Sequence, residues 1–114
     1  MVNKWEIYLC NLDPTQGSEQ RGVRPVLIIS TDGVNHNLTV STVLPLSSVK
    51  ENDKIYPTEI LLPTNITNLP KLSVAMVQQI RTVSHQRLTN KVSTITDRET
   101  REKILESCRN YFDL

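Results

Sequence analysis

The sequence lacks the short motifs that mark many enzymes and the long apolar runs that mark membrane proteins. It has no G-x-S-x-G, G-x-x-x-x-G-K-[ST] or H-E-x-x-H pattern and no EF-hand loop, so chemistry that depends on a bound cofactor is not expected. The opening segment MVNKWEIYLCNLD has one lysine and two acids around a short apolar stretch, which fits neither a signal peptide nor a membrane span. We therefore expect a cytoplasmic protein without a membrane partner.

Cysteine is scarce and charge is balanced. Cys10 and Cys108 stand near opposite ends of the chain without C-x-x-C or Cys/His spacing, so we expect reduced, packed thiols and no disulfide framework or metal site. The 13 Lys and Arg residues against 12 Asp and Glu residues give a formal net charge of +1. Any site for a polyanion must therefore be local. The length of 114 residues predicts one domain spanning 1–114.

Short apolar runs bounded by Pro, Asn, Asp and Ser predict a mainly β protein. The predicted strands are Trp5–Leu12, Pro25–Ser30, Val40–Leu46, Thr58–Pro63, and a segment Leu72–Ser84 that forms one long bent strand or two shorter ones. The segments 48–57 and 63–70 are predicted to be an exposed linker and turns. Five to seven short strands with one closing helix predict a strongly bent antiparallel sheet or a small barrel.

One helix is predicted, at the C-terminus. Thr96 and Glu99 have the spacing of a capping box. Apolar residues then recur at helical spacing and are predicted to pack on the sheet; they are Ile104, Leu105, Cys108, Tyr111 and Phe112. The two histidines, His36 in a polar turn and His85 near a strand end, are interpreted as surface residues.

A polar loop, Asp13–Pro25, separates the first two predicted strands. It holds two of the three glycines, Gly17 and Gly22, which permit turns with positive φ. Arg24 lies at the start of a buried strand, so its guanidinium would be held on a rigid base and suits a phosphate. Three residues in the middle of the loop could read base edges or sugar hydroxyls: Ser18, Glu19 and Gln20. Composition alone leaves open a solvated loop in which Arg24 is an ordinary surface charge.

These residues resemble the toxins of the MazF/PemK (Kid) family. The pattern G-S-E-Q-x-G-x-R-P precedes an apolar strand, the motif Q-I-R-T follows at Gln79–Thr82, and the similarity runs in order from about Ile7 to the C-terminal helix. The resemblance implies an SH3-like barrel with a C-terminal helix. It also implies a homodimeric, cytoplasmic toxin of a type II toxin–antitoxin pair that cuts single-stranded RNA at specific sequences without a metal ion.

The resemblance also implies roles for individual residues. Arg24 corresponds to the family's catalytic arginine, and Ser47 falls where many relatives have a catalytic threonine. RNA contact is implied for Ser18, Glu19, Gln20 and Gln79. Arg81 and Thr82 are expected to support the site or the dimer. Many relatives have Gly-Asp where this chain has Trp5-Glu6, and several have an acid where it has Gln78.

Such cleavage is compatible with the residues present. The substrate's own 2′-hydroxyl attacks the phosphate, so the protein has to align it, stabilise the developing charge and protonate the leaving oxygen. Arg24 could stabilise that charge and Ser47 could hold a phosphate oxygen. Glu19 could act as a general base or accept hydrogen bonds from a nucleobase. Tyr56 could stack on an unpaired base or pack on the barrel.

Two other functions remain open from the sequence. Some toxins of this fold bind and poison DNA gyrase, although those relatives lack the G-S-E-Q loop and its arginine. A non-catalytic SH3-like module that binds RNA or a peptide is the second alternative. The family resemblance further implies a cognate antitoxin with a partly disordered acidic segment. That segment would suit the basic residues Arg21, Arg24, Arg81 and Arg87.

Overall fold

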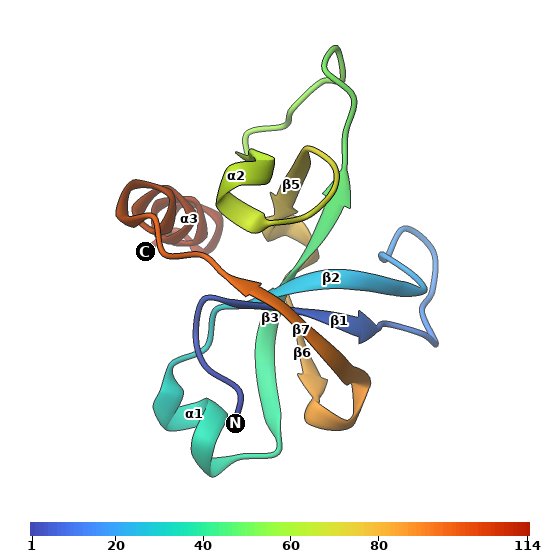
Figure 1. The fold of residues 1–114 in the computed structure, drawn as a ribbon, viewed down its shortest axis with the longest axis vertical. Coiled ribbons are helices and arrows are strands. Elements are labelled where there is room, and N and C mark those ends of the chain that lie inside the picture. Colours follow the sequence, from blue (N-terminus) through green and yellow to red (C-terminus); the bar gives the residue numbers. More distant parts are fainter.

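A seven-stranded antiparallel sheet forms most of the computed structural model, which describes residues 1–114 (Figure 1). The strands are β1 (Glu6–Asn11), β2 (Val23–Ile28), β3 (Val40–Ser48), β4 (Glu59–Leu62), β5 (Ser73–Met76), β6 (Arg81–Ser84) and β7 (Leu88–Thr94). The helices are α1 (Asp32–Asn37), α2 (Thr64–Thr67) and α3 (Arg98–Phe112), with 3₁₀ turns η1 (Val77–Gln79) and η2 (His85–Arg87). The strand order is β4-β5-β3-β2-β1-β7, and β6 also pairs with β3.

Strand β3 gives the sheet its strong bend. Its first residues pair with β6, with Val40 opposite Ser84, whereas its last residues pair with β5, with Ser48 opposite Ser73. Pro45 lies between these two segments, where β3 also pairs with β2. One strand thus joins the two parts of the sheet seen at the bottom and top of Figure 1. The predicted mainly β, strongly bent antiparallel sheet with a C-terminal helix is confirmed, and the hydrogen-bonded order is open rather than a closed ring.

Two apolar clusters form the core. The larger cluster lies between strands of the sheet and α3 and includes Ile7, Leu27, Leu44 and Ile104, all fully buried. The smaller cluster contains Cys10, Leu12, Val26, Ile28, Val43 and Val83. Neighbouring residues of β2 contribute to different clusters, because side chains alternate between the faces of a strand. Both cysteines are free, as predicted.

Helix α3 packs on the sheet through only part of the predicted apolar stripe. Ile104 is fully buried, and Leu105 and Cys108 pack partly buried against the larger cluster. Tyr111 and Phe112 are 44% and 52% exposed and contact each other edge to face, with ring centroids 5.1 Å apart. The prediction that these two aromatic residues pack on the sheet is therefore wrong, because the last turn of α3 extends beyond the core.

The helix cap also differs from the prediction. Asp97, and not Thr96, is the N-cap: its carboxylate accepts hydrogen bonds from the backbone N–H of Thr100 at 2.9 Å and from the Thr100 hydroxyl at 2.6 Å. The predicted pairing of Thr96 with Glu99 is not formed, because a carboxylate one residue later already satisfies the first turn.

Several short elements were not expected. His36 lies in α1 and not in a turn, and the segment 63–70 contains the four-residue helix α2. The segment Leu72–Ser84 forms two strands separated by η1, which is the second of the two predicted alternatives. Strand β7 had no predicted counterpart. Helices of four to six residues are too short to show an apolar period, and β7 has an exposed, polar middle. These elements are stabilised by their neighbours more than by their own sequences.

Trp5, at the entry to β1, adopts a backbone conformation that glycine favours. Its φ is 75°, a region in which side chains are strained. The indole is nevertheless buried at 8% exposure in the larger cluster, and the Trp5 backbone bonds to Ile28 and Ile95 at 2.8 Å each. Burial and two backbone hydrogen bonds therefore offset the strain.

None of the helices has the length and apolar character needed to cross a membrane.

Candidate active site

The polar loop Asp13–Pro25 is closed by hydrogen bonds at its base. The Leu12 N–H donates to the Gly22 carbonyl at 2.9 Å, and the Gly22 N–H donates to the Asp13 carboxylate at 3.1 Å. Gly17 and Gly22 have φ of 55° and 76°, which confirms the predicted positive-φ turns. A Cβ would meet open space at both glycines, so it is the backbone conformation that favours glycine there.

Two arginines from later strands support this base. Arg81 donates to the Leu12 carbonyl at 3.1 Å. Arg87 donates to the Asn11 carbonyl at 3.1 Å and to the Asp13 carbonyl. Each guanidinium group thus uses some of its N–H donors to hold the base of the loop. This contact is compatible with the supporting role expected for Arg81. No local pattern predicts this contact of Arg87, because it joins residues more than 70 positions apart.

Gln79 holds the middle of the loop. Its side-chain oxygen accepts from the Gln20 N–H at 3.3 Å, and its side-chain nitrogen donates to the Ser18 carbonyl at 3.1 Å. The predicted RNA-contacting residues Ser18, Gln20 and Gln79 therefore lie together. In this arrangement Gln79 positions the loop through its amide, so a direct contact with RNA would require it to exchange these bonds.

The other polar side chains of the loop differ in their contacts. Glu19 accepts from the Gln16 N–H at 2.5 Å and shapes the turn. The Gln20 side-chain oxygen is buried without a hydrogen-bond partner in the chain. An unpaired buried acceptor is unusual in folded proteins. It leaves Gln20 with hydrogen-bonding capacity that the fold does not use.

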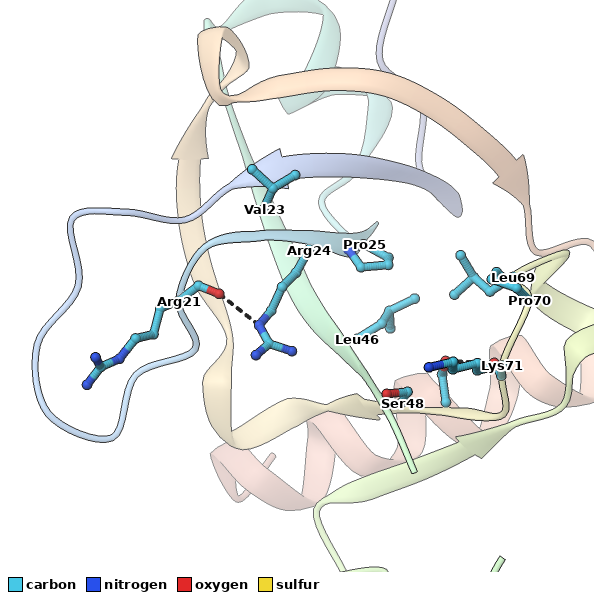
Figure 2. Close-up of a pocket in the computed structure, with 10 residues that line it drawn as sticks. Arg21, Val23, Arg24, Pro25, Leu46, Ser48, Leu69, Pro70 and Lys71 are labelled. Carbon is cyan, nitrogen blue, oxygen red and sulfur yellow. Dashed lines mark hydrogen bonds between the residues drawn. The ribbon is translucent and has the colours of Figure 1, made fainter. Parts of the chain in front are cut away.

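Arg24 is the second residue of β2, and its side chain is half-buried. Its Nε donates to the Arg21 carbonyl at 2.8 Å, which fixes the direction of the guanidinium (Figure 2). Its two terminal nitrogens have no partner within the chain, and Arg24 forms no ion pair. A fixed guanidinium with two free N–H₂ groups is suited to bind a phosphate or carboxylate.

A pocket of about 410 Å³ lies beside Arg24. It is lined by Arg21, Val23, Arg24, Pro25, Leu46, Ser48, Leu69, Pro70, Lys71 and Ser73. Three of these ten residues are cationic and none is acidic. The molecule's net charge of +1 therefore conceals a local basic site, which is what a site for a polyanion needs in a protein of nearly balanced charge.

Ser47 does not line this pocket; its neighbour Ser48 does. The pairing of β2 with β3 runs Ile28 to Val43, Leu27 to Leu44 and Val26 to Pro45. This pairing ends at Val26 and Pro45, and Ser47 pairs with Val74 of β5, so no backbone pairing joins Ser47 to Arg24. Because side chains alternate along a strand, Ser47 points to the other face of β3 from Ser48, which lines the pocket with Arg24.

Tyr56 lies apart from this site. It is 53% exposed in the segment between β3 and β4, and the Lys54 ammonium lies 5.2 Å from the centre of its ring. The structure therefore does not pack Tyr56 into the barrel, and the pocket beside Arg24 does not include it. That segment projects at the top of Figure 1, whereas the polar loop projects at the right.

Gln78, which precedes the Q-I-R-T glutamine, faces a different segment from Gln79. It accepts from the Thr58 hydroxyl at 2.8 Å and donates to the Glu59 carboxylate at 3.2 Å. Its side chain therefore joins η1 to the start of β4 and takes no part in holding the polar loop.

Cys10 lies opposite Arg24 in the β1–β2 pairing. Burial raises the pKa of its thiol, against the lowering effect of the nearby Arg81 and Arg87 charges. The thiol is therefore neutral near pH 7 and is a poor nucleophile.

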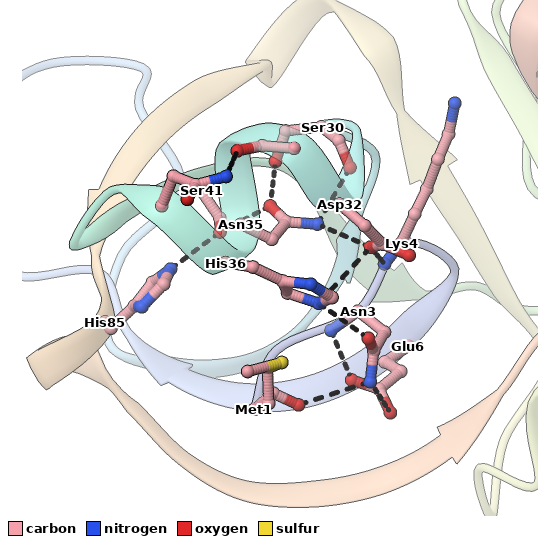
Figure 3. Close-up of polar contacts among 12 residues, drawn as sticks. Met1, Asn3, Lys4, Glu6, Ser30, Asp32, Asn35, His36, Ser41 and His85 are labelled. Atoms are coloured by element: carbon pink, nitrogen blue, oxygen red, sulfur yellow. Dashed lines mark hydrogen bonds and ion pairs between the residues drawn. The ribbon is translucent and has the colours of Figure 1, made fainter.

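The histidines belong to a polar network away from the pocket (Figure 3). Its centre is Asn35, whose side-chain oxygen accepts from the hydroxyls of Ser30 at 2.5 Å and Ser41 at 2.7 Å. His85 Nε2 bonds to the Ser41 hydroxyl at 2.7 Å, and His36 Nε2 to the Asn3 side chain at 2.8 Å. His36 is exposed, as interpreted from the sequence, whereas His85 is half-buried and is a surface residue only in part. Neither histidine lines the pocket beside Arg24.

No group of three or more His, Cys, Asp or Glu side chains is placed to hold a metal ion. The chemistry that the site itself offers is anion binding by Arg24 and its neighbours. The fold is a small bent β-sheet with a C-terminal helix, and it holds a rigid basic site at the edge of one polar loop. Together they define a small β protein that binds an anionic ligand.

Comparison with known proteins gives the family. Residues 3–112 match the model for the PemK-like, MazF-like toxin of type II toxin–antitoxin systems. The chain is 35% identical over 102 residues to the Endoribonuclease MazF of Staphylococcus saprophyticus, covering 90% of this chain and 84% of that protein. The chain therefore belongs to the PemK-like, MazF-like toxin family.

Solved structures agree on the fold. MazF from Deinococcus radiodurans matches with a TM-score of 0.83 at 18% identity, covering 99% of this chain and 97% of that one. An endoribonuclease in complex with its cognate antitoxin, from a mycobacterial species, matches with a TM-score of 0.79 at 18% identity, covering 100% and 97%. The strongly bent antiparallel sheet with a C-terminal helix is thus shared with these solved structures.

Proposed function

We propose that this protein is the toxin of a type II toxin–antitoxin pair and acts as an endoribonuclease on single-stranded RNA through Arg24 and Ser47. It belongs to the PemK-like, MazF-like toxin family, and its curated relative is an endoribonuclease. The observation that carries the assignment of the site is the fixed Arg24 guanidinium, bonded through Nε at 2.8 Å with its terminal nitrogens free.

The proposed reaction is a transesterification. The 2′-hydroxyl of the substrate loses its proton as its oxygen forms a bond to the adjacent phosphorus, the bond from phosphorus to the 5′-oxygen breaks, and the 5′-oxygen gains a proton, so that no proton is gained or lost overall. The products are a 2′,3′-cyclic phosphate and a 5′-hydroxyl. Because the nucleophile belongs to the substrate, no metal ion is required to generate it.

Arg24 acts on the charge that develops on the phosphorane. Its two free N–H₂ groups match two phosphate oxygens, and they are already oriented by the bond to the Arg21 carbonyl. Ser47, which follows Leu46 of the pocket in β3, donates its hydroxyl to a non-bridging oxygen. Prior orientation of the Arg24 guanidinium lowers the reorganisation required in the transition state.

The polar loop supplies RNA contacts at one side of this centre. Ser18, Glu19 and Gln20 meet the bases, and the Gln20 side-chain oxygen, buried and unpaired within the chain, turns outward to accept from an exocyclic amine of a base. Tyr56, half-exposed in its own segment, stacks on a base further along the strand. Gln79 keeps the loop in place through Ser18 and Gln20.

The proposal includes assembly and partners. The chain acts in the cytoplasm as one domain, forms a homodimer and is held inactive by a cognate antitoxin. A related endoribonuclease has been solved with its cognate antitoxin, and the basic pocket beside Arg24 suits an acidic, partly disordered segment of such a partner.

The test is cleavage of a long unstructured RNA by the purified protein in EDTA. We expect cutting at a small set of sequences, products with 5′-hydroxyl ends, and loss of cutting at a site when its nucleotide carries a 2′-deoxy sugar. Binding of the 2′-deoxy substrate should remain nearly unchanged, since only the nucleophile is removed.

Two results would contradict the proposal. Intact RNA together with inhibition of DNA gyrase would assign the protein to the gyrase-directed toxins. Binding of RNA without cutting by fresh, folded protein would assign it to the non-catalytic modules.

A further inference from the structure

The pocket beside Arg24 contains residues that the cleavage chemistry does not use. Leu69, Pro70 and Lys71 come from the turn between α2 and β5, which is far in sequence from the polar loop and from β3. Ser48 reaches the pocket from the end of β3. The antiparallel pairing of Ser48 with Ser73 brings this turn against β3. The fold therefore adds a second wall to the site.

The two walls of the pocket both carry positive charge. Arg24 lies on the β2 side and Lys71 on the opposite side, with Leu46 between them (Figure 2). The Lys71 side chain is exposed, and its ammonium takes part in none of the four ion pairs and in no hydrogen bond of the chain. A cation without an acidic partner, in a pocket with no acid, attracts an anion from solution.

The floor between these cations is apolar. Pro25, Leu46 and Leu69 line it, and Leu46 and Leu69 belong to the larger core cluster. Such a surface holds a flat apolar ring better than it holds a second charged group. The volume of about 410 Å³ lies in the range of about 300–1,000 Å³ that small-molecule sites occupy. An occupant with one ring system and an attached anion fits this combination of floor and walls.

We propose that this pocket binds one nucleotide of the RNA substrate next to the scissile phosphate, with Lys71 binding that nucleotide's phosphate and the apolar floor contacting its base. The inference rests on the proposed nuclease function. It is supported by the position of Arg24, which lines the pocket and to which the proposed function gives the scissile phosphate. A strand of RNA that places its scissile phosphate at Arg24 therefore has its next nucleotide at the pocket.

The substitution Lys71→Met tests the phosphate contact. It removes the charge from an exposed side chain that makes no bond within the fold. Lys103→Met is the matched control, because it removes the same charge from an exposed position on α3 outside the pocket. Binding is measured with a substrate made uncleavable by one 2′-deoxy sugar, over a range of potassium chloride concentrations.

We expect Lys71→Met to weaken binding about fivefold, as for the loss of one exposed charge pair, with kcat little changed. The slope of log affinity against log salt should fall by about 0.7, the value for one phosphate contact on a single strand. Lys103→Met should change neither quantity.

Single neutral methylphosphonate linkages, placed one at a time along the substrate, locate the contact. At the linkage next to the cleaved one, the methylphosphonate should weaken wild-type binding and should add nothing to Lys71→Met, because both changes remove the same interaction. At other linkages the two effects should add.

The outcomes separate the two hypotheses. If the wild-type protein does not cut RNA, the proposed function fails and the nucleotide pocket with it. If it cuts RNA but Lys71→Met behaves as Lys103→Met does, only the nucleotide pocket is overturned. Unchanged RNA binding with weaker binding of an acidic antitoxin peptide would also overturn it, and would assign the pocket to the antitoxin.

Discussion

The polar loop and the polar network around Asn35 use similar residues in opposite ways. Asn35 is 3% exposed, and its amide makes four hydrogen bonds, two at the oxygen and two at the nitrogen. This is the full capacity of an amide in such a site. In the polar loop, the terminal nitrogens of Arg24 and the side-chain oxygen of Gln20 have no partner within the chain.

The difference separates structural polarity from functional polarity. A polar group that is saturated by its neighbours holds the fold together and has nothing to offer a ligand. A polar group that is fixed by one hydrogen bond, and whose other donors or acceptors are unpaired, can bind a ligand. The candidate site contains both kinds, because Arg81, Arg87 and Gln79 use their side chains on the backbone of the loop and of the residues just before it.

The largest expected effect is that of Arg24→Ala. Cleavage of single-stranded RNA should fall by at least about 100-fold, because a preoriented transition-state donor is lost, while the melting temperature stays close to that of the wild type. Single-turnover cleavage and thermal unfolding measure the two quantities. Arg98→Ala, on the exposed first turn of α3, is the control for loss of one arginine charge. Normal cleavage by Arg24→Ala would show that the catalytic assignment is wrong.

Asn35→Ala should have the reverse pattern. Loss of the amide leaves the Ser30 carbonyl without its donor and the buried Ser41 hydroxyl with His85 as its remaining partner, at a cost of about 3 kcal/mol in the free energy of unfolding. Urea unfolding measures the loss, and kcat at 25 °C should be unchanged. Asn37→Ala, on the exposed end of the same helix, should cost far less. A loss of kcat without a loss of stability in Asn35→Ala would remove the distinction between the two regions.

Gln79→Ala should lie between these cases. It removes both hydrogen bonds that fix the loop at Ser18 and Gln20, so we expect cleavage to fall about tenfold through misplacement of the loop, with little change in unfolding free energy. The rate of limited proteolysis within Asp13–Pro25 should rise. An unchanged proteolysis rate with a raised KM would instead indicate that Gln79 contacts RNA directly, as the family resemblance implies.

The smallest effect concerns Glu6, which continues the network of Figure 3 through Asn3. Burial raises the pKa of Glu6, but the hydrogen bonds from Lys91, at 2.7 Å, and from Asn3 outweigh it, so the pKa lies below its ordinary value. The ionised form therefore stabilises the fold above the unfolded-state pKa of about 4.3, and this contribution is lost as the pH falls through the folded-state pKa.

The substitution Lys91→Met measures that contribution. It should lower the free energy of unfolding by about 1 kcal/mol at pH 7, and the difference from the wild type should vanish near pH 3, where Glu6 is protonated in the unfolded chain and increasingly so in the folded one. Thermal unfolding at both pH values is the measurement. A difference that persists unchanged at pH 3 would mean that Lys91 acts through packing and not through charge.

Much of the fold could be predicted from local patterns. The apolar runs placed β1 to β5 within a few residues, and the glycines marked both positive-φ turns of the loop. The elements that were missed, α1, α2 and β7, have no apolar period of their own. They form because β3, β1 and the core present complementary surfaces to them, and such long-range effects leave no local signal.

The sequence by itself determined the family, the position of Arg24 at the start of a strand, and the polar residues of the loop, because these are local patterns of residue type and spacing. Only the tertiary structure decided which of those residues are free. Arg81, Arg87 and Gln79 bond to a loop that is about 60 or more residues away, and the pairing of β3 with β5 brings Lys71 to the pocket beside Arg24. The physical reason is that hydrogen bonds and charge interactions depend on the distance between groups in space and not on their separation along the sequence.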